Sequence, residues 1–449
     1  MMRALFASLV VIGLLAGLTA APASASAAVS LAPAPSAATP DDVTAPTPTP
    51  TAEVDEGDPI RNAEYWLDDY GVAEAWETTR GAGVRIAIID TGIARGPEEF
   101  AGAVVGGTDV SGVGTPDGRT PVGAVDADHG SWVASLAAAR GTGPDEGMIG
   151  VAPEAELLSI SVGFGSTAQV PFSQQIAEAI VWAVDNGADV INLSFTTNGT
   201  TWDESWDDAF MYAFDHDVVM IVAAGNRGSG TTKVGAPATI PGVLTVGGVD
   251  PYGRASVGAS TQGITIGVSA PSERLIGVSP DGTLVWWDGT SGAAPIVAGI
   301  AALVRAAHPE LDANNVINRI VSTATPSTFA TADPDPLYGY GLVDAARAVS
   351  APVAEVDSNP MGSLSDWIRL YRRADSSPVP SEAAQPAVVP ELPPIENVTT
   401  AASPLLPTYA TVLYGTVPLV LVTASAILVA LGVTAAVRRI RSANSSPRR

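Results

Sequence analysis

Five short, mostly apolar runs, separated by stretches with helical periodicity, limit this chain to few folds. Each run is short for a helix and nearly continuous in apolar residues, as expected of a strand buried on both faces of a parallel sheet. Between two of them, residues 174–186 place Ile176, Ile180 and Val184 on one face, and Gly187 provides a helix stop. The pattern predicts an α/β fold with a doubly wound, mostly parallel sheet flanked by helices. The five runs are residues 84–89, 157–162, 190–193, 218–224 and 243–249.

The two ends of the chain predict export and membrane anchoring. Residues 1–27 have a short basic start, an apolar run and an Ala-rich end, which is the pattern of a signal peptide; the alternative, an N-terminal anchor, needs a longer run. Residues 412–437 are apolar without a charge, and the arginine-rich tail 438–449 follows. A helix of that length spans a bilayer core of about 30 Å, and the arginines favour the cytoplasmic side. We therefore expect a single-pass protein of the cell membrane with an extracellular body and a cytoplasmic C-terminus.

Two Pro-rich segments separate these ends from the body. Residues 28–59 are rich in Pro, Ala and Thr, and residues 353–411 are rich in Pro, so neither segment has the composition of a core. We interpret them as an N-terminal arm and a linker, which leaves residues 60–352 as the folded domain. Within the linker, residues 364–373 have the pattern of one short amphipathic helix, either docked on the domain or acting as a spacer.

The composition argues against nucleic acid as a partner and excludes disulfides as a source of stability. The chain has 22 basic and 47 acidic residues and a net charge of −25, so a basic groove for nucleic acid is not expected. It contains no cysteine. An exported protein without cysteine has no disulfides, so packing, or packing together with bound ions, must supply its stability.

Three residues that are far apart in the sequence have the types and the order of a nucleophilic catalytic site. Asp90 follows the first apolar run, His129 opens a segment of small residues, and Ser291 precedes an apolar helical stretch. An acid, a base and a hydroxyl nucleophile in this order match one arrangement of the Ser-His-Asp triad. Two simpler interpretations exist. Asp90 lies in Asp-Thr-Gly, which also marks aspartic proteases, but these need a second such motif and the sequence has none. Ser291 would also suit a helix cap, but its Gly and Ala neighbours leave the hydroxyl uncrowded.

Taken with further motifs, residues 60–350 resemble the subtilisin-like serine proteases, or subtilases. The three motifs occur in family order, together with residues 190–194, which match the substrate-pairing strand, and residues 222–226, which match the oxyanion strand. The resemblance implies that Ser291 attacks the scissile carbonyl, that His129 transfers the proton and that Asp90 orients His129. It also implies that the Asn226 amide and the Ser291 backbone N–H stabilise the oxyanion.

The resemblance further implies where a polypeptide substrate lies. From its place directly after Asn226, and not from the resemblance, Arg227 is expected on the rim of the pocket for the residue before the scissile bond, where it would favour an acidic or polar side chain. Gly235 would lie near the floor of this pocket. An extended peptide would pair with two segments through backbone hydrogen bonds, namely Leu193, Ser194, Phe195 and Thr196 on one side and Ala223, Ala224 and Gly225 on the other.

The chain departs from the family pattern near the predicted nucleophile. Gly292 stands where most relatives have methionine, Ser131 replaces a threonine, and residues 195–197 replace the usual Leu-Gly. None of these changes removes a reacting group. Many subtilases bind calcium in surface loops, and Asp145 and Glu146 offer oxygen ligands for such a structural ion, although solvated acidic residues are the simpler interpretation. The predicted chemistry requires no cofactor.

The layout of signal, short arm, protease, Pro-rich linker, span and basic tail is similar to that of the mycosins, which are membrane-anchored subtilases of type VII secretion systems. Mycosins usually carry cysteine pairs, and this chain has none. The likeness implies secretion-system components as partners, beside a polypeptide substrate and a membrane contact through one C-terminal helix.

Three functions are compatible with these features. The leading one is a membrane-tethered, extracytoplasmic serine endopeptidase that hydrolyses exported proteins. The second is a catalytically weak or inactive subtilase-fold subunit that scaffolds a type VII-like secretion complex. The third is another acyl hydrolase, acting on peptide amides or esters. The joint presence of Asp90, His129, Asn226 and Ser291 favours an active enzyme.

Overall fold

A computed structural model describes residues 58–123, 126–165 and 168–372, together with parts of 421–435. The predicted signal peptide and basic tail lie outside the described residues, as do most of the arm, most of the predicted span and the linker from residue 373 to 411. These predictions therefore stay predictions.

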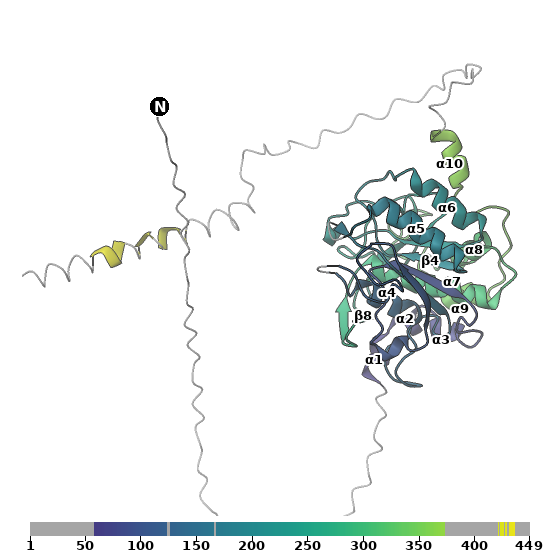
Figure 1. The fold of residues 1–449 in the computed structure, drawn as a ribbon, viewed down its shortest axis with the longest axis horizontal. Coiled ribbons are helices and arrows are strands. Elements are labelled where there is room, and N and C mark those ends of the chain that lie inside the picture. Colours follow the sequence, from purple (N-terminus) through teal and green to yellow (C-terminus); the bar gives the residue numbers. More distant parts are fainter. Residues whose placement is uncertain are drawn as a thin grey trace, which may run out of the picture. The chain divides into compact units, whose positions relative to one another are not determined.

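The core of the domain is a seven-stranded parallel sheet, which confirms the predicted fold class (Figure 1). Its strand order is β2-β3-β1-β4-β5-β6-β7, and a separate antiparallel pair is formed by β8 and β9. All five predicted apolar runs are strands of the sheet. The strands are β1 (Arg85–Asp90), β2 (Val104–Asp109), β3 (Glu156–Ser161), β4 (Val190–Leu193), β5 (Val219–Ala223), β6 (Leu244–Val249), β7 (Ile266–Pro271), β8 (Leu275–Val278) and β9 (Leu284–Trp287).

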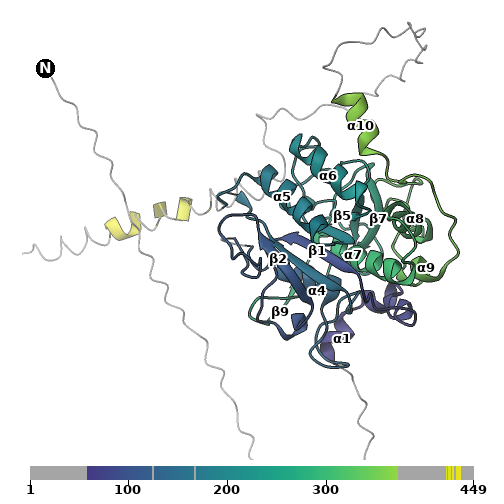
Figure 2. The same cartoon turned by 45° about the vertical axis from the view of Figure 1, so that its right-hand side comes forward.

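Helices cover both faces of the sheet, and the alternation of side chains along β1 shows how (Figures 1 and 2). Ile86 and Ile88 point into one hydrophobic cluster, and Ala87 and Ile89 point into the other. The first cluster contains the apolar faces of α4, α7, α8 and α9, and the second contains those of α5 and α6. The helices are α1 (Pro59–Ala63), α2 (Trp66–Asp69), α3 (Val72–Ala75), α4 (His129–Ala138), α5 (Phe172–Asp185), α6 (Ser205–Asp215), α7 (Thr290–Ala307), α8 (Ala313–Thr323), α9 (Ala345–Ser350) and α10 (Leu364–Tyr371).

Helix α7 is the central helix of the domain. It contacts β4, β5, β6 and β7 as well as α4, and the side chains from Gly292 to Val304 are all buried. Within the described residues it is the one helix that is long and apolar enough to cross a membrane, but 78 % of that stretch is buried inside the protein. Its hydrophobicity is therefore that of a core helix.

The compact unit extends past residue 352, to Ile368. Leu364 at the start of α10 is buried in the second cluster, and the Trp367 ring lies 4.5 Å from the Trp202 ring, centroid to centroid. Residues 364–368 thus dock on the domain. Docking is the first of the two alternatives for the amphipathic helix that the sequence predicts at residues 364–373.

Candidate active site

Asp90 and His129 form a hydrogen-bonded pair at the carboxyl edge of the sheet. Asp90 is the last residue of β1, which lies between β3 and β4, so its fully buried carboxylate emerges at the centre of that edge. His129 begins α4, and its Nδ1 lies 2.8 Å from Asp90 Oδ1 and 3.0 Å from Oδ2. The Thr91 backbone N–H also donates to Asp90 Oδ1. A carboxylate in this position fixes the orientation of the imidazole and stabilises its cationic form.

The Asp90 carboxylate controls the protonation of His129. Burial lowers the pKa of His129, but the charge and the hydrogen bond of Asp90 raise it, the nearby Asp126 charge adds to them, and the net pKa lies above the usual value. The ring keeps 22 % of its side-chain surface exposed, so Nε2 remains open to the cavity. His129 is thus placed to accept and return a proton near neutral pH.

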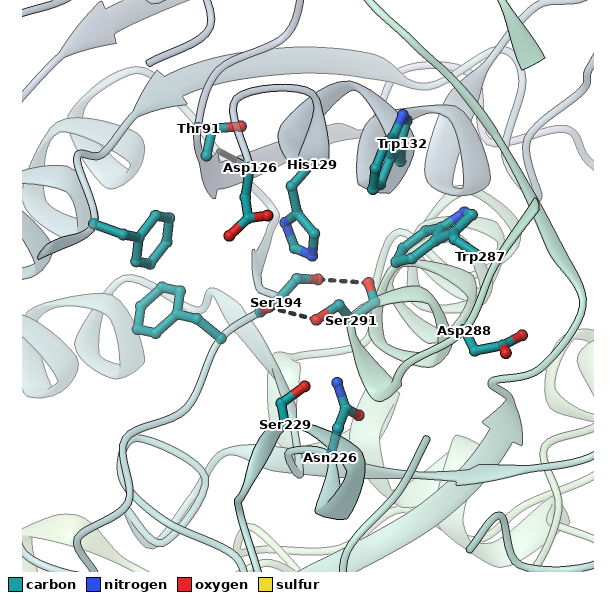
Figure 3. A pocket seen from close by; sticks show the side chains of 12 residues that line it. Thr91, Asp126, His129, Trp132, Ser194, Asn226, Ser229, Trp287, Asp288 and Ser291 are labelled. Carbon is teal, nitrogen blue, oxygen red and sulfur yellow. Dashed lines mark hydrogen bonds between the residues drawn. The ribbon is translucent and has the colours of Figure 1, made fainter. Parts of the chain in front are cut away.

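Ser291 and Ser194 hold each other through two hydrogen bonds, drawn as dashed lines in Figure 3. The Ser291 hydroxyl donates to the Ser194 carbonyl (2.9 Å), and the Ser194 hydroxyl donates to the Ser291 carbonyl (2.9 Å). Asn192 Nδ2 in turn donates to the Ser194 hydroxyl (2.9 Å). The His129 ring points toward this pair in Figure 3. The Ser291 hydroxyl is thus bonded to Ser194 rather than to His129, and catalytic hydrogen bonds are often completed only with substrate bound.

Asn226 follows strand β5 and faces the first turn of α7. Its Oδ1 accepts hydrogen bonds from the Thr290 backbone N–H (2.8 Å) and the Thr290 hydroxyl (3.0 Å). With Oδ1 occupied, the Asn226 Nδ2 group points toward Ser291 in Figure 3. Thr290 Oγ1 also accepts from the Gly225 backbone N–H (2.9 Å), so one threonine joins the ends of β5 and α7. An amide donor held in this way is suited to stabilise a developing oxyanion.

A cavity of about 360 Å3 is lined by His129, Ser194, Asn226 and Ser291. Aromatic rings form the wall on one flank of it. The centroid of the Trp287 ring lies 5.8 Å from that of His129 and 5.7 Å from that of Trp132. Phe164 and Phe195, whose centroids are 5.7 Å apart, line another part of the cavity. The cavity is therefore a cleft in which aromatic rings flank a set of convergent polar groups, as is typical of an active site.

Residues of the β8-β9 hairpin explain why a glycine follows Ser291. A Cβ atom on Gly292 would lie 2.2 Å from Leu275 Cδ1, 3.1 Å from Leu136 Cδ1 and 3.3 Å from Trp287 Cη2. Leu275 of β8 and Trp287 of β9 thus occupy the space of a side chain at this position. The departure from the family pattern is compensated by the β8-β9 hairpin.

The predicted substrate-binding residues divide into those that line the cavity and those that lie behind it. Ser194 and Phe195 line it, and Thr196 is half-buried next to them. Gly235 lies beneath the neighbouring segment, where a Cβ atom would approach the Thr197 carbonyl oxygen too closely for any side chain. The remaining residues of the two segments are buried at or just after the ends of β4 and β5, namely Leu193, Ala223, Ala224 and Gly225.

Arg227 does not line the cavity. Its Nη2 donates to the Ser256 carbonyl (3.0 Å), so the guanidinium points into a neighbouring loop. The predicted preference for an acidic side chain through Arg227 therefore has no support in the structure.

A metal site is not evident in the part of the chain that the structure describes. No group of three or more His, Cys, Asp or Glu side chains there is placed to hold a metal ion. The loop with Asp145 and Glu146 is closed by its own backbone, with Thr142 N donating to Glu146 O (2.9 Å). Calcium binding at this loop stays a prediction.

Several residues of the site were not predicted from the sequence, namely the cavity-lining residues Trp132, Phe164, Ser229, Trp287 and Asp288 and three further polar residues, Thr91, Thr290 and Asp126. Thr91 supports the loop before His129, since its hydroxyl donates to Ala127 O (2.8 Å) and accepts from Gly130 N (2.8 Å). Thr290 holds Asn226 as described above, and Asp126 lines the cavity. The two threonines directly follow or precede a predicted catalytic residue, which is the signal that identifies them. A single aspartate in a loop gives no such signal.

Comparison with known proteins agrees with this geometry. The profile of the subtilase family, Peptidase S8, matches residues 81–341. Mycosin-4 of Mycobacterium tuberculosis is 36 % identical over 321 residues, which cover 62 % of this chain and 67 % of mycosin-4. Subtilisin DY of Bacillus licheniformis is 36 % identical over 274 residues, which cover 60 % of this chain and 92 % of that protein.

Comparison with solved structures finds similar folds in two crystal structures of MycP1. The crystal structure of MycP1 with its N-terminal propeptide removed aligns with a TM-score of 0.55 and 29 % identity, covering 66 % of this chain and 99 % of MycP1. A crystal structure described as MycP1 from the ESX-1 type VII secretion system aligns with a TM-score of 0.57 and 28 % identity, covering 66 % of this chain and 88 % of that one.

Proposed function

This chain belongs to the subtilase family of serine proteases, and from that premise we propose that it is an extracytoplasmic endopeptidase that uses Ser291 as its nucleophile. The observation that carries the proposal is the pairing of His129 Nδ1 with the fully buried Asp90 carboxylate, beside Ser291 in one cavity. A general base that is oriented by an acid and placed next to a hydroxyl is the arrangement that activates serine for acyl transfer.

The reaction follows from the roles of these groups. His129 Nε2 removes the proton of the Ser291 hydroxyl as Oγ attacks the scissile carbonyl carbon, and the carbonyl oxygen becomes an oxyanion. Asn226 Nδ2 and the Ser291 backbone N–H donate to that oxygen. The His129 imidazolium then gives its proton to the leaving amine, and the C–N bond breaks to leave an acyl-enzyme. Water, activated by His129, hydrolyses the ester and restores the Ser291 hydroxyl.

A polypeptide substrate suits the cavity better than a small ester. The cleft runs past Ser194 and Phe195, where an extended peptide can form backbone hydrogen bonds, and the aromatic walls on both flanks can bind side chains. Exported proteins are the proposed substrates because the predicted signal peptide and C-terminal span place the domain outside the membrane. Association with a type VII-like secretion complex belongs to the same proposal, on the strength of the mycosin relatives.

The proposal is tested by incubating the full chain with an unfolded polypeptide and identifying new termini by mass spectrometry. We expect internal cleavage by the unaltered protein and none by Ser291→Ala or His129→Ala at equal concentration. Intact substrate with all three proteins would favour the alternative of an inactive scaffolding subunit. Cleavage that persists in Ser291→Ala would point to a contaminating protease.

A further inference from the structure

One carboxylate in the catalytic cavity has no assigned role in substrate recognition. Asp126 lies three residues before His129 and lines the cavity, with its side chain exposed. Its backbone carbonyl accepts the His129 N–H (3.1 Å), which fixes the position of the residue at the start of α4. Within the part of the chain that the structure describes, no hydrogen bond or ion pair involves the Asp126 carboxylate. The charge therefore faces the cavity and is not neutralised.

The rest of the cavity does not balance this charge. Among the described residues that line the cavity, the only other ionisable ones are His129 and Asp288, and none is a lysine or arginine. Arg227 does not balance it either, because its guanidinium donates to Ser256 O. An unpaired carboxylate at the edge of the cleft attracts a cationic group of the substrate, because no positive charge among the described lining residues opposes it.

The position of Asp126 indicates which substrate residue it meets. In Figure 3, Asp126 lies on one flank of His129 and Trp287 lies on the opposite flank. The aromatic wall formed by Trp132 and Trp287 fills the second flank. Asp126 therefore lies on the side where the acyl part of a peptide that pairs with Ser194 must run.

The alternation of side chains along an extended peptide indicates which single substrate residue can contact Asp126. Successive side chains of an extended peptide point to opposite faces. The residue whose carbonyl reaches Ser291, P1, directs its side chain away from His129 and into the cleft floor. The preceding residue, P2, then directs its side chain toward His129 and Asp126.

We propose that Asp126 selects a lysine or arginine at P2 of the polypeptide substrate. The selection rests on the proposed endopeptidase function and assigns it a substrate class, namely polypeptides with a basic residue one position before the acyl residue. The cationic side chain forms a charge-assisted hydrogen bond with the Asp126 carboxylate. An interaction of this kind corresponds to about 10- to 100-fold in kcat/KM.

The test compares matched peptides that differ only at P2. Internally quenched peptides with Lys, Gln or Glu at P2 are assayed with the full chain and with Asp126→Asn. We expect kcat/KM for the Lys peptide to exceed that for the Gln peptide about 10- to 100-fold in the unaltered protein, and the ratio to fall to about 1 in Asp126→Asn. Asp126→Glu should retain a preference for Lys. Equal rates for Lys and Gln in the unaltered protein, or an unchanged ratio in Asp126→Asn, would overturn the inference.

A nearby aspartate provides the matched control. Asp128 lies two residues further on, at the start of α4, and does not line the cavity. Asp128→Asn makes the same charge change and should keep the preference for Lys. An equal loss of preference in Asp128→Asn would mean that general charge, rather than Asp126, sets the specificity.

A covalent probe separates this inference from the proposed function. Peptidyl diphenyl phosphonates react with an activated serine, and their inactivation rates report P2 selectivity without turnover. Faster inactivation by the Lys compound than by the Gln compound, lost in Asp126→Asn, would support the inference. Equal inactivation rates would refute the P2 selection and leave the serine protease intact. No reaction with either phosphonate or with a simple fluorophosphonate would refute the proposed function and, with it, the inference.

Discussion

The side-chain oxygen of Asn226 accepts two hydrogen bonds from Thr290. Oδ1 of Asn226 accepts from the Thr290 backbone N–H at 2.8 Å and from its hydroxyl at 3.0 Å. This contact fixes the amide so that Nδ2 is the group that faces Ser291 (Figure 3). Thr290, which precedes the nucleophile Ser291, thus orients the Asn226 amide, the proposed oxyanion donor. Substitutions of Asn226 and of Thr290 can separate the effect of the donor from the effect of its orientation.

Removal of the Asn226 amide should reduce catalysis with little effect on binding. We expect Asn226→Ala to lower kcat about 10²- to 10³-fold, a range that comes from a subtilisin oxyanion-hole residue, while KM changes little because the donor acts on the transition state. Steady-state kinetics with one peptide substrate provides the measurement. A variant with unchanged kcat would show that Asn226 is only a turn residue.

Loss of the Thr290 hydroxyl should have a smaller effect of the same kind. Thr290→Val keeps the backbone N–H bond to Asn226 Oδ1 but removes the bonds of Oγ1 to Asn226 and to the Gly225 N–H. We expect roughly a 10-fold lower kcat and a lower melting temperature, because a buried N–H loses its acceptor. If Thr290→Val lowered kcat as much as Asn226→Ala, the hydroxyl itself would have to contact the substrate.

The pH profile of the enzyme should reflect the Asp90–His129 pair. His129 must be neutral to act as a base, and its pKa is raised, so kcat/KM should increase with pH through a midpoint above the usual histidine value of about 6.5. Asp126→Asn should move this midpoint to lower pH, because it removes a nearby negative charge. The profile is measured from pH 5 to 9 with a substrate that does not titrate. A wild-type midpoint below that of free histidine would contradict the assigned environment.

Gly292 should not tolerate a side chain unless the hairpin residue that faces it is reduced. A Cβ atom at this position meets Leu275 Cδ1 at 2.2 Å, so Gly292→Ala should destabilise the protein by about 1–3 kcal/mol through overpacking. In Gly292→Ala/Leu275→Ala the added methyl group fills part of the space that Leu275 vacates. Urea denaturation should then show a combined loss smaller than the sum of the two single losses. Additive losses would mean that Leu275 does not restrict this position.

Glu64 should make the stability depend on pH. Its carboxyl is 2 % exposed, Oε1 accepts the Ile149 N–H, and burial raises its pKa to about 8. Between the unfolded value of 4.5 and about 8, the unfolded chain releases this proton and the folded one retains it, so the contribution of Glu64 to stability falls as pH rises. Glu64→Gln should therefore melt higher than the unaltered protein at pH 8.5, with a smaller difference at pH 5. Equal melting curves at both pH values would exclude this account.

The sequence predicted the centre of the fold better than its edges. The inner strands are continuous apolar runs and were recognised, whereas β2 was missed because Gly106 and Gly107 interrupt its pattern at the sheet edge. A Cβ atom on Gly107 would lie 2.2 Å from the Asp117 carbonyl oxygen, so a loop contact, which has no local signal, determines that residue. Propensity alone does not encode such contacts.

In the active site, too, residues with a local sequence signal were predicted and residues placed by tertiary contacts were not. Asp90, His129 and Ser291 were identified because each lies in a motif at an element boundary, and the structure brings all three together. The predicted position of Arg227 on the pocket rim finds no support, because its guanidinium donates to Ser256 O, a tertiary contact that the local sequence does not show. Asp126 was missed for the converse reason, since only the fold places it in the catalytic cleft.

The identity of the nucleophile is tested most directly by covalent labelling. The full chain is treated with diisopropyl fluorophosphate, which transfers its phosphoryl group to an activated serine with release of fluoride, and the modified residue is located by peptide mass spectrometry. We predict one adduct, on Ser291, which is absent in Ser291→Ala and strongly slowed in His129→Ala. A folded protein that takes up no label, or that takes it up on another residue, would contradict the account.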